Sequence, residues 1–215
     1  MSRKKIGITL KVLEHPEHDE IMTCIDVEWI NLLLSLDFIP TLIPLTSIEH
    51  TCLIWNDLEL NGLILSGGNT LSVVEKDESE KNVYLERDIF EKSLLEMAIK
   101  KDIPILGVCR GLQVINTYFN GGLVRFDGQI GKRQKIISLK KNDFKFPEEV
   151  TCYHNYIVTS DLLGDELIPL AHDINGNIQA LSHSTHKVLG LMWHPEREQS
   201  EDYTSNDIIR EHLNK

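Results

Sequence analysis

The first half of the chain alternates short apolar runs with longer segments in which apolar residues recur at helical spacing. The apolar runs predict β-strands at 5–10 (KIGITL), 38–45 (FIPTLIPL), 60–68 (LNGLILSGG) and 102–108 (DIPILGV). The amphipathic segments predict helices at 26–36, 83–101 and 111–121. Strands that alternate with helices form βαβ units. We therefore expect an α/β fold with a mostly parallel central sheet and helices on both faces.

After residue 123 the pattern changes to shorter strand-like runs separated by turns. These runs are 135–139 (KIISL), 156–160 (YIVTS), 178–183 (IQALSH) and 187–193 (KVLGLMW). Their short spacing predicts small antiparallel additions to the parallel sheet. No repeat, low-complexity tract or linker-like stretch divides the chain, so we expect residues 1–215 to form a single domain.

Composition and charge exclude several classes of function. The chain has 215 residues, of which 41% are hydrophobic, and a net charge of −11 that argues against nucleic-acid binding. The longest apolar stretches, such as 103–108, are too short to span a bilayer, and no secretory signal is visible, so we expect a cytoplasmic protein without a membrane partner. The 4 cysteines form no CxxC pair, and no metal-ligand spacing is present, so we expect no metal and no other cofactor.

Positive charge is concentrated in residues 125–141, where several cations face only one acidic residue, Asp127. Lys132 and Arg133 in this stretch are candidates for contact with the anionic part of a small-molecule substrate. The alternative is a solvated basic loop and strand, because runs of charge usually lie in water.

Two glycine-containing segments, 66–69 (SGGN) and 107–111 (GVCRG), directly follow predicted strands. In parallel α/β sheets the ligand crevice lies at the carboxyl ends of the strands. We therefore expect both segments to border the same crevice.

Cys109 lies between Gly107 and Gly111 where a predicted strand meets a predicted helix, which is the arrangement of a nucleophile elbow. Glycines permit the tight turn, and the N-terminus of the following helix favours a thiolate. The backbone N–H of Arg110 is a candidate oxyanion donor. The alternative is that Cys109 is a buried core cysteine and the glycines only serve the turn.

A cysteine nucleophile requires a histidine base, and the base requires an acceptor that orients it. His194 follows an apolar strand and precedes Pro195, and Glu196 lies two residues further on, where it can accept a hydrogen bond from the imidazole. His154 is either part of a pocket wall or a packed, hydrogen-bonded residue. The remaining histidines are predicted to be structural or surface residues.

Together these motifs resemble the class I (triad) glutamine amidotransferases, and among them the stand-alone γ-glutamyl hydrolases. The resemblance rests on ordered segments at 65–70 (LSGGNT), 86–123 (with the elbow GVCRGLQ), 150–158 (VTCYHNYIV) and 188–196 (VLGLMWHPE). It extends from about residue 6 to residue 198. It implies a flavodoxin-like fold of the class I glutamine amidotransferase type.

The resemblance also implies roles for individual residues in the reaction. Cys109 would be the nucleophile, His194 the base and Glu196 the orienting partner of that base. Gly68 and Arg110 would supply the N–H groups that hold the oxyanion.

Further residues would form the substrate pocket. The resemblance implies that Gln113 seats the glutamyl group, and that Arg87 and Asp88 make polar contacts on the substrate side. His154 and Asn155 lie in a segment that borders the glutamyl pocket in this family.

The implied activity is hydrolysis of a γ-glutamyl–nitrogen bond through a γ-glutamyl thioester, which releases L-glutamate. The favoured substrate is γ-glutamyl-CDP-amidate, giving cytidine diphosphoramidate for capsule phosphoramidate synthesis, because the basic stretch 125–141 can meet a diphosphate. Amides of γ-aminobutyrate or polyamines stay open as substrates. A glutaminase subunit that delivers ammonia to a separate synthase, and a non-catalytic binding module, also stay open, as does an oligomeric state.

Overall fold

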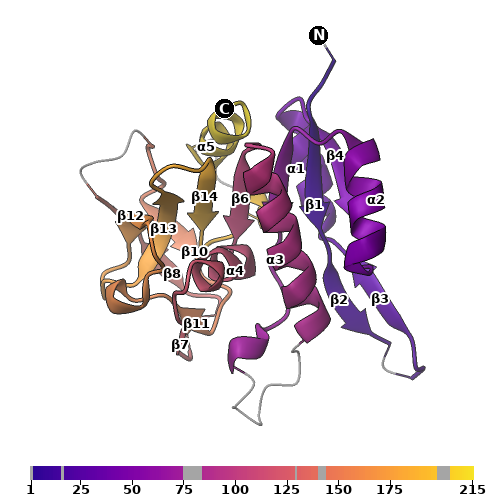
Figure 1. The fold of residues 1–215 in the computed structure, drawn as a ribbon. Helices are drawn as coiled ribbons and strands as arrows, with labels where there is room; N and C mark the ends of the chain where they lie inside the picture. Colours follow the sequence, from indigo (N-terminus) through magenta and orange to yellow (C-terminus); the bar gives the residue numbers. More distant parts are fainter. Residues whose placement is uncertain (1, 16, 75–83, 129, 140–143, 198–203) are drawn as a thin grey trace.

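The computed structural model describes residues 2–15, 17–74, 84–128, 130–139, 144–197 and 204–215. In this part of the chain an 8-stranded sheet has the order β4–β1–β5–β6–β14–β13–β12–β9 (Figure 1). Its strands are β1 (Lys5–Thr9), β4 (Ile39–Ile43), β5 (Gly62–Leu65), β6 (Ile105–Val108), β9 (Ile137–Ser138), β12 (Leu167–His172), β13 (Ile178–His183) and β14 (Val188–Leu191). Strands β4 to β14 in that order are parallel, and β13, β12 and β9 are antiparallel additions. The predicted mostly parallel sheet with antiparallel additions is confirmed.

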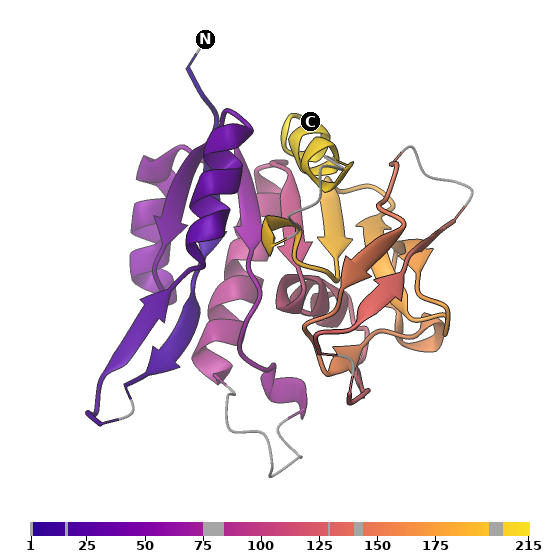
Figure 2. The same cartoon turned by 180° about the vertical axis from the view of Figure 1, so that it is seen from behind.

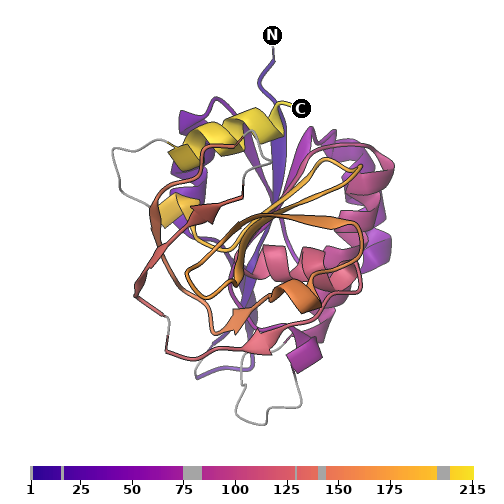
Figure 3. The ribbon, with the colours of Figure 1, turned by 90° about the vertical axis from the view of Figure 1, so that its left-hand side faces the viewer.

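Helices cover both faces of this sheet, as predicted (Figure 3). The helices α1 (Val27–Ser35) and α5 (Thr204–Leu213) pack on one face, and α2 (Ile48–Leu58), α3 (Leu85–Lys100) and α4 (Arg110–Tyr118) pack on the other. Successive side chains of a strand point to opposite faces, so in β5 Ile64 packs in the cluster of α1 and α5, and Leu63 and Leu65 pack in that of α3 and α4. Strands β5, β6 and β14 are buried along their whole length for this reason.

One strand pairs differently from the expectation. The segment 187–193 was expected among the antiparallel additions, but β14 lies parallel to β6, while its other neighbour, β13, is antiparallel to it. An apolar run of this length carries no information about its partner's direction, so only the tertiary structure decides the pairing. As a result, the parallel strands β5, β6 and β14 are adjacent and end at the same edge of the sheet.

Smaller two-stranded sheets surround that edge (Figure 2). They pair β2 (Lys11–Glu14) with β3 (Ile21–Cys24), β7 (Val124–Arg125) with β11 (Tyr156–Ile157), and β8 (Arg133–Lys135) with β10 (Glu149–Thr151). Helices α2 and α5 and the β2–β3 hairpin were not predicted from the sequence. Among the described residues, no helix is both long enough and apolar enough to cross a bilayer.

Candidate active site

The carboxyl ends of β5, β6 and β14 bring together three segments that are distant in sequence. Leu65 of β5 is paired with Gly107 of β6, and Val108 of β6 is paired with Leu191 of β14. The chain then continues from these strands into the glycine loop 66–69, into Cys109 and into His194. Both glycine-containing segments therefore border one crevice, as the sequence predicted.

Cys109 occupies a sharp turn between β6 and α4. Its φ of 53° and ψ of −106° are strained for a residue with a side chain, and the side chain is only 6% exposed. The flanking glycines are required by close contacts, because a Cβ on Gly107 would lie 2.6 Å from the carbonyl oxygen of Gly111 and a Cβ on Gly111 would overlap the carbonyl oxygen of Leu65. The elbow geometry predicted at Cys109 is thus present.

Helix α4 begins at Arg110, directly after Cys109. The first N–H groups of a helix have no partner within the helix, and they carry partial positive charge. The N-terminus of α4 therefore adjoins the Cys109 sulfur and can stabilise negative charge there and on a bound oxygen.

His194 lies between the glycine loop and Glu196. Its Nδ1 is 2.6 Å from Oε1 of Glu196, and both side chains are buried. A Cβ on Gly67 would lie 2.6 Å from Cε1 of His194 and 3.5 Å from Cβ of Cys109, so the loop, the imidazole and the cysteine are packed against one another. The ring of Tyr153 covers the imidazole edge-on, with 5.5 Å between centroids.

Electrostatics favour the charged form of His194. Burial lowers its pKa, but the charge and hydrogen bond of Cys109 and those of Glu196 raise it by more, so that the pKa is raised to about 9. The imidazole therefore carries a proton at neutral pH between two acceptors. This is the protonation state in which it can donate to a departing nitrogen.

A cavity of about 260 Å³ opens over these residues. It is lined by Gly68, Asn69, Thr70, Cys109, Arg110, Gln113, Ile130, Tyr153, His154, Asn155, Tyr156, His194 and Arg197. The predicted pocket residues Gly68, Gln113, His154 and Asn155 are all among them.

Two of these residues share one acceptor. Gln113 Nε2 lies 3.1 Å from the carbonyl oxygen of Tyr156, and Nδ1 of His154 lies 2.9 Å from the same oxygen. Burial lowers the pKa of His154 to about 4, so this histidine is neutral at pH 7 and its Nδ1 donates to the carbonyl. The cavity thus contains one protonated and one neutral histidine.

Comparison with known proteins assigns the family. The model of the peptidase C26 family matches residues 5–149. A γ-glutamyl-CDP-amidate hydrolase from Campylobacter jejuni is 31% identical over 196 residues, which are 90% of this chain and 90% of that protein. This chain belongs to the peptidase C26 family. It is accordingly a hydrolase of the glutamine amidotransferase-like type.

Other relatives of this C26 hydrolase are glutamine-dependent proteins. The glutamine-hydrolysing component of GMP synthase from Methanocaldococcus jannaschii is 27% identical, and the match covers 82% of each chain. The crystal structure of a glutamine amidotransferase from Thermotoga maritima superimposes with a TM-score of 0.63 at 16% identity, covering 90% of this chain and 76% of that one. That structural likeness confirms the class I glutamine amidotransferase-like fold.

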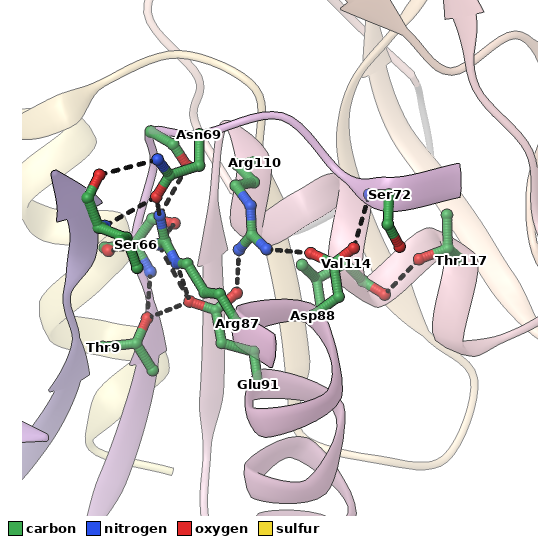
Figure 4. A network of polar contacts seen from close by, with 12 residues as sticks. Thr9, Ser66, Asn69, Ser72, Arg87, Asp88, Glu91, Arg110, Val114 and Thr117 are labelled. Atoms are coloured by element: carbon green, nitrogen blue, oxygen red, sulfur yellow. Dashed lines mark hydrogen bonds and ion pairs between the residues drawn. The ribbon is translucent and has the colours of Figure 1, made fainter. Parts of the chain in front are cut away.

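The structure corrects the prediction for Arg87 and Asp88. They were expected to contact the substrate, but in this C26 hydrolase their exposures are 0% and 4%, and neither lines the cavity. Both lie in a buried polar network on α3 that also contains Arg110 and Glu91 (Figure 4). The sequence shows that these residues are charged, but it does not show that the charges are paired inside the protein.

Lys132 and Arg133 do not line the cavity either. Both are exposed, and Nε of Arg133 lies 3.7 Å from Oε2 of Glu149 on the adjacent strand. Ile130 of the same segment does line the cavity. Contact between the two cations and a leaving group that extends beyond the cavity stays a prediction.

Arg197 and Tyr153 are cavity residues that were not identified from the sequence. The guanidinium carbon of Arg197 lies 5.0 Å from the centroid of the Tyr153 ring, and its Nε lies 3.2 Å from Asp26. Their positions next to His194 and His154 in sequence were a usable signal. Among the described residues, no group of three or more His, Cys, Asp or Glu side chains is arranged to hold a metal ion.

Proposed function

We propose that this protein is a cysteine hydrolase that cleaves a γ-glutamyl–nitrogen bond, with γ-glutamyl-CDP-amidate as its substrate. The observation that carries the proposal is the arrangement of Cys109, His194 and Glu196 at a cavity that reaches Gln113. A strained cysteine at a helix N-terminus, next to a charged histidine held by a carboxylate, is suited to nucleophilic attack on a carbonyl.

The reaction proceeds in two halves. In the first, the Cys109 thiolate attacks the γ-carbonyl, the N–H groups of Gly68 and Arg110 hold the oxyanion, and His194 transfers its proton to the leaving nitrogen. The products of this half are a γ-glutamyl thioester and the free amine or amidate. In the second, His194 removes a proton from water, which attacks the thioester and releases L-glutamate and the thiol.

The substrate class is proposed from the similarity to the Campylobacter jejuni γ-glutamyl-CDP-amidate hydrolase, which extends over 90% of both chains. Cleavage would release glutamate and cytidine diphosphoramidate. The similarity to the glutamine-hydrolysing component of GMP synthase supports a second candidate, a glutaminase that delivers ammonia to a separate synthase. The two candidates share the same nucleophile and base, so the leaving group distinguishes them.

A panel of γ-glutamyl amides tests the proposal. The purified protein is incubated with γ-glutamyl-CDP-amidate, γ-glutamyl-γ-aminobutyrate, a γ-glutamyl polyamine and free glutamine, and glutamate release is measured, with the Cys109→Ala variant as the blank. We expect the highest kcat/KM on the CDP-amidate, and an intact-mass adduct of one glutamyl group on Cys109 after rapid quenching. Turnover of glutamine alone would favour the glutaminase, and equal activity in Cys109→Ala would overturn the cysteine mechanism.

A further inference from the structure

A buried network of charged residues connects the two segments that supply the proposed oxyanion donors (Figure 4). We propose that Arg87, acting with Glu91 and Arg110, is a positioning residue that orients the backbone N–H groups of Gly68 and Arg110 toward the reacting carbonyl. This inference rests on the proposed function, because it concerns the oxyanion formed in that reaction.

The guanidinium of Arg87 binds the glycine loop from behind. Its Nη2 donates to the carbonyl oxygens of Ser66 and Gly67, each at 3.1 Å, and its Nη1 donates to the carbonyl oxygen of Gly68 at 2.7 Å and to Oδ1 of Asn69 at 2.6 Å. One side chain thus fixes three consecutive peptide groups.

The orientation of these carbonyls determines where the N–H groups point. In a trans peptide the C=O and N–H bonds point in opposite directions, and the described residues contain no cis peptide bond. Because the carbonyl of Gly67 points at Arg87, the N–H of Gly68 in the same peptide points away from it. Gly68 lines the catalytic cavity, and Arg87 does not.

Glu91 links this loop to the nucleophile elbow. Its Oε1 accepts from Nε of Arg87 at 3.0 Å and from the hydroxyl of Thr9 at 2.7 Å, while its Oε2 accepts from the side chain of Arg110. The Thr9 hydroxyl in turn accepts from the N–H of Ser66 at 3.0 Å. Arg110 also pairs with Asp88 one helical turn from Glu91. The two oxyanion donors are therefore held by one helix, α3.

The charges in this network are balanced and retained. Two guanidinium groups, Arg87 and Arg110, face two carboxylates, Asp88 and Glu91. Burial lowers the pKa of Arg87 to about 10, with a smaller effect from Arg110, so Arg87 stays charged at neutral pH. Burial acts to raise the pKa of Glu91, but Arg110 and Arg87 together lower it, so Glu91 stays ionised.

Stability alone is a weak explanation for such a network. The cost of removing charges from water commonly offsets their attraction, and well-packed apolar residues stabilise a core equally well. An apolar side chain cannot, however, bind three carbonyl oxygens and so select one orientation of their peptides. The planar, multiply donating guanidinium of Arg87 is suited to that task.

Replacing Arg87 tests the inference in the full-length enzyme. In Arg87→Lys and Arg87→Met, we expect kcat for the substrate that the wild type hydrolyses to fall, up to the roughly 10²–10³-fold that the loss of one oxyanion donor costs, with KM nearly unchanged. Alkylation of Cys109 by iodoacetamide should proceed at the wild-type rate, because that displacement forms no oxyanion. Lys100→Met is the matched control, since Lys100 pairs with Glu96 at the same spacing on the exposed side of α3.

A second variant covers the case in which the Arg87 variants fail to fold. Thr9→Val is nearly isosteric and removes the hydroxyl that bonds both Ser66 N–H and Glu91. We expect the same separation of effects, a lower kcat with unchanged alkylation.

The outcomes separate this inference from the proposed function. Wild-type kcat in a folded Arg87 variant, or an equal loss of kcat and of alkylation rate, overturns the positioning role. A wild-type protein that releases glutamate from none of the γ-glutamyl amides instead overturns the proposed function, and the inference with it.

Discussion

The backbone N–H of Cys109 donates a 2.7 Å hydrogen bond to the carbonyl oxygen of Leu191. This bond extends the parallel ladder of β6 and β14 by one residue beyond Val108. It joins the nucleophile elbow to the strand that leads to His194, three residues after Leu191. The two groups that must exchange a proton are therefore held together by the end of the sheet.

The carboxylate of Glu196 should be needed for catalysis, because it orients His194 and supports its charge. We expect Glu196→Gln to lower kcat by about 10²-fold or more, since a positioned acid–base group typically contributes 10²–10⁴-fold. Glu166→Gln is the matched control, because Glu166 lies 3.6 Å from His183 in a glutamate–histidine pair outside the cavity. Steady-state assays of both variants decide the point, and comparable losses in the two would contradict it.

The pKa of His194 should depend on the Cys109 sulfur. We expect a histidine with a pKa of about 9 in the wild type, and a clearly lower pKa for it in Cys109→Ala, where burial is opposed only by Glu196. NMR titration of the imidazole signals measures both, and His212, whose pKa burial lowers to about 4, serves as a reference that should not move. An unchanged His194 titration in Cys109→Ala would contradict a coupled pair.

The same coupling has a sign for stability. Because folding raises the pKa of His194 above 6.5, the stabilisation it provides is fully present below pH 6.5 and is lost as the pH rises through about 9.

Acid should destabilise the fold through His212. Its Nε2 lies 2.9 Å from the carbonyl oxygen of Ile105, and burial lowers its pKa from 6.5 to about 4. The unfolded chain therefore binds this proton more readily, and stability is lost as the pH falls from 6.5 towards 4, by about 1.4 kcal/mol per pH unit in the steepest part.

Urea unfolding between pH 7 and pH 4.5 measures this dependence. We expect His212→Gln to be less stable at pH 7 but to lose less stability on acidification, whereas the exposed His50→Gln should retain the wild-type slope. Parallel curves for wild type and His212→Gln would refute the assignment.

A side chain at position 111 should disrupt the elbow. A Cβ on Gly111 meets the backbone carbonyl of Leu65, which cannot rotate away, so we expect Gly111→Ala to cost about 3 kcal/mol of stability and most of the activity. Gly131→Ala is the comparison, because nothing lies within 4 Å of its Cβ although its φ is +78°, and it should cost roughly 1–2 kcal/mol. Thermal unfolding of both variants tests the difference, and a Gly111→Ala protein as stable as Gly131→Ala would contradict the clash.

Charge reversal in the segment 132–133 tests the leaving-group prediction. We expect the double variant Lys132→Glu, Arg133→Glu to raise KM for γ-glutamyl-CDP-amidate and to leave KM for an uncharged γ-glutamyl amide unchanged. The control is the double variant Arg3→Glu, Lys4→Glu, which makes the same charge change before β1. If KM for the nucleotide substrate does not change, these cations do not contact the diphosphate.

Much of the fold was predictable because its signals are local. The alternation of short apolar runs with amphipathic segments identified β1, β4, β5, β6, α1, α3 and α4. Helix α2 was missed because its buried face contains only Thr51 and Trp55, which leaves a weak periodic signal. The β2–β3 hairpin was missed because its residues are mostly half-buried or exposed, so no clean alternation marks it.

The candidate site divides in the same way. Cys109, His194 and Glu196 were identified because their neighbours in sequence carry the signal: paired glycines at the elbow, and a carboxylate two residues after the histidine. Arg87 and Asp88 were assigned to the substrate side incorrectly. Their partners, Arg110 and the carbonyls of 66–68, are about twenty residues away along the chain, and no local pattern reveals such pairing.

The sequence by itself determined which residues are chemically competent and which turn presents the thiol, because those properties depend on side-chain type and on a few adjacent residues. Only the tertiary structure decided that β14 runs parallel beside β6, and that α3 turns its charges inward against the glycine loop. Both outcomes depend on contacts between residues far apart in the chain, where burial and hydrogen bonding across several elements outweigh any local preference.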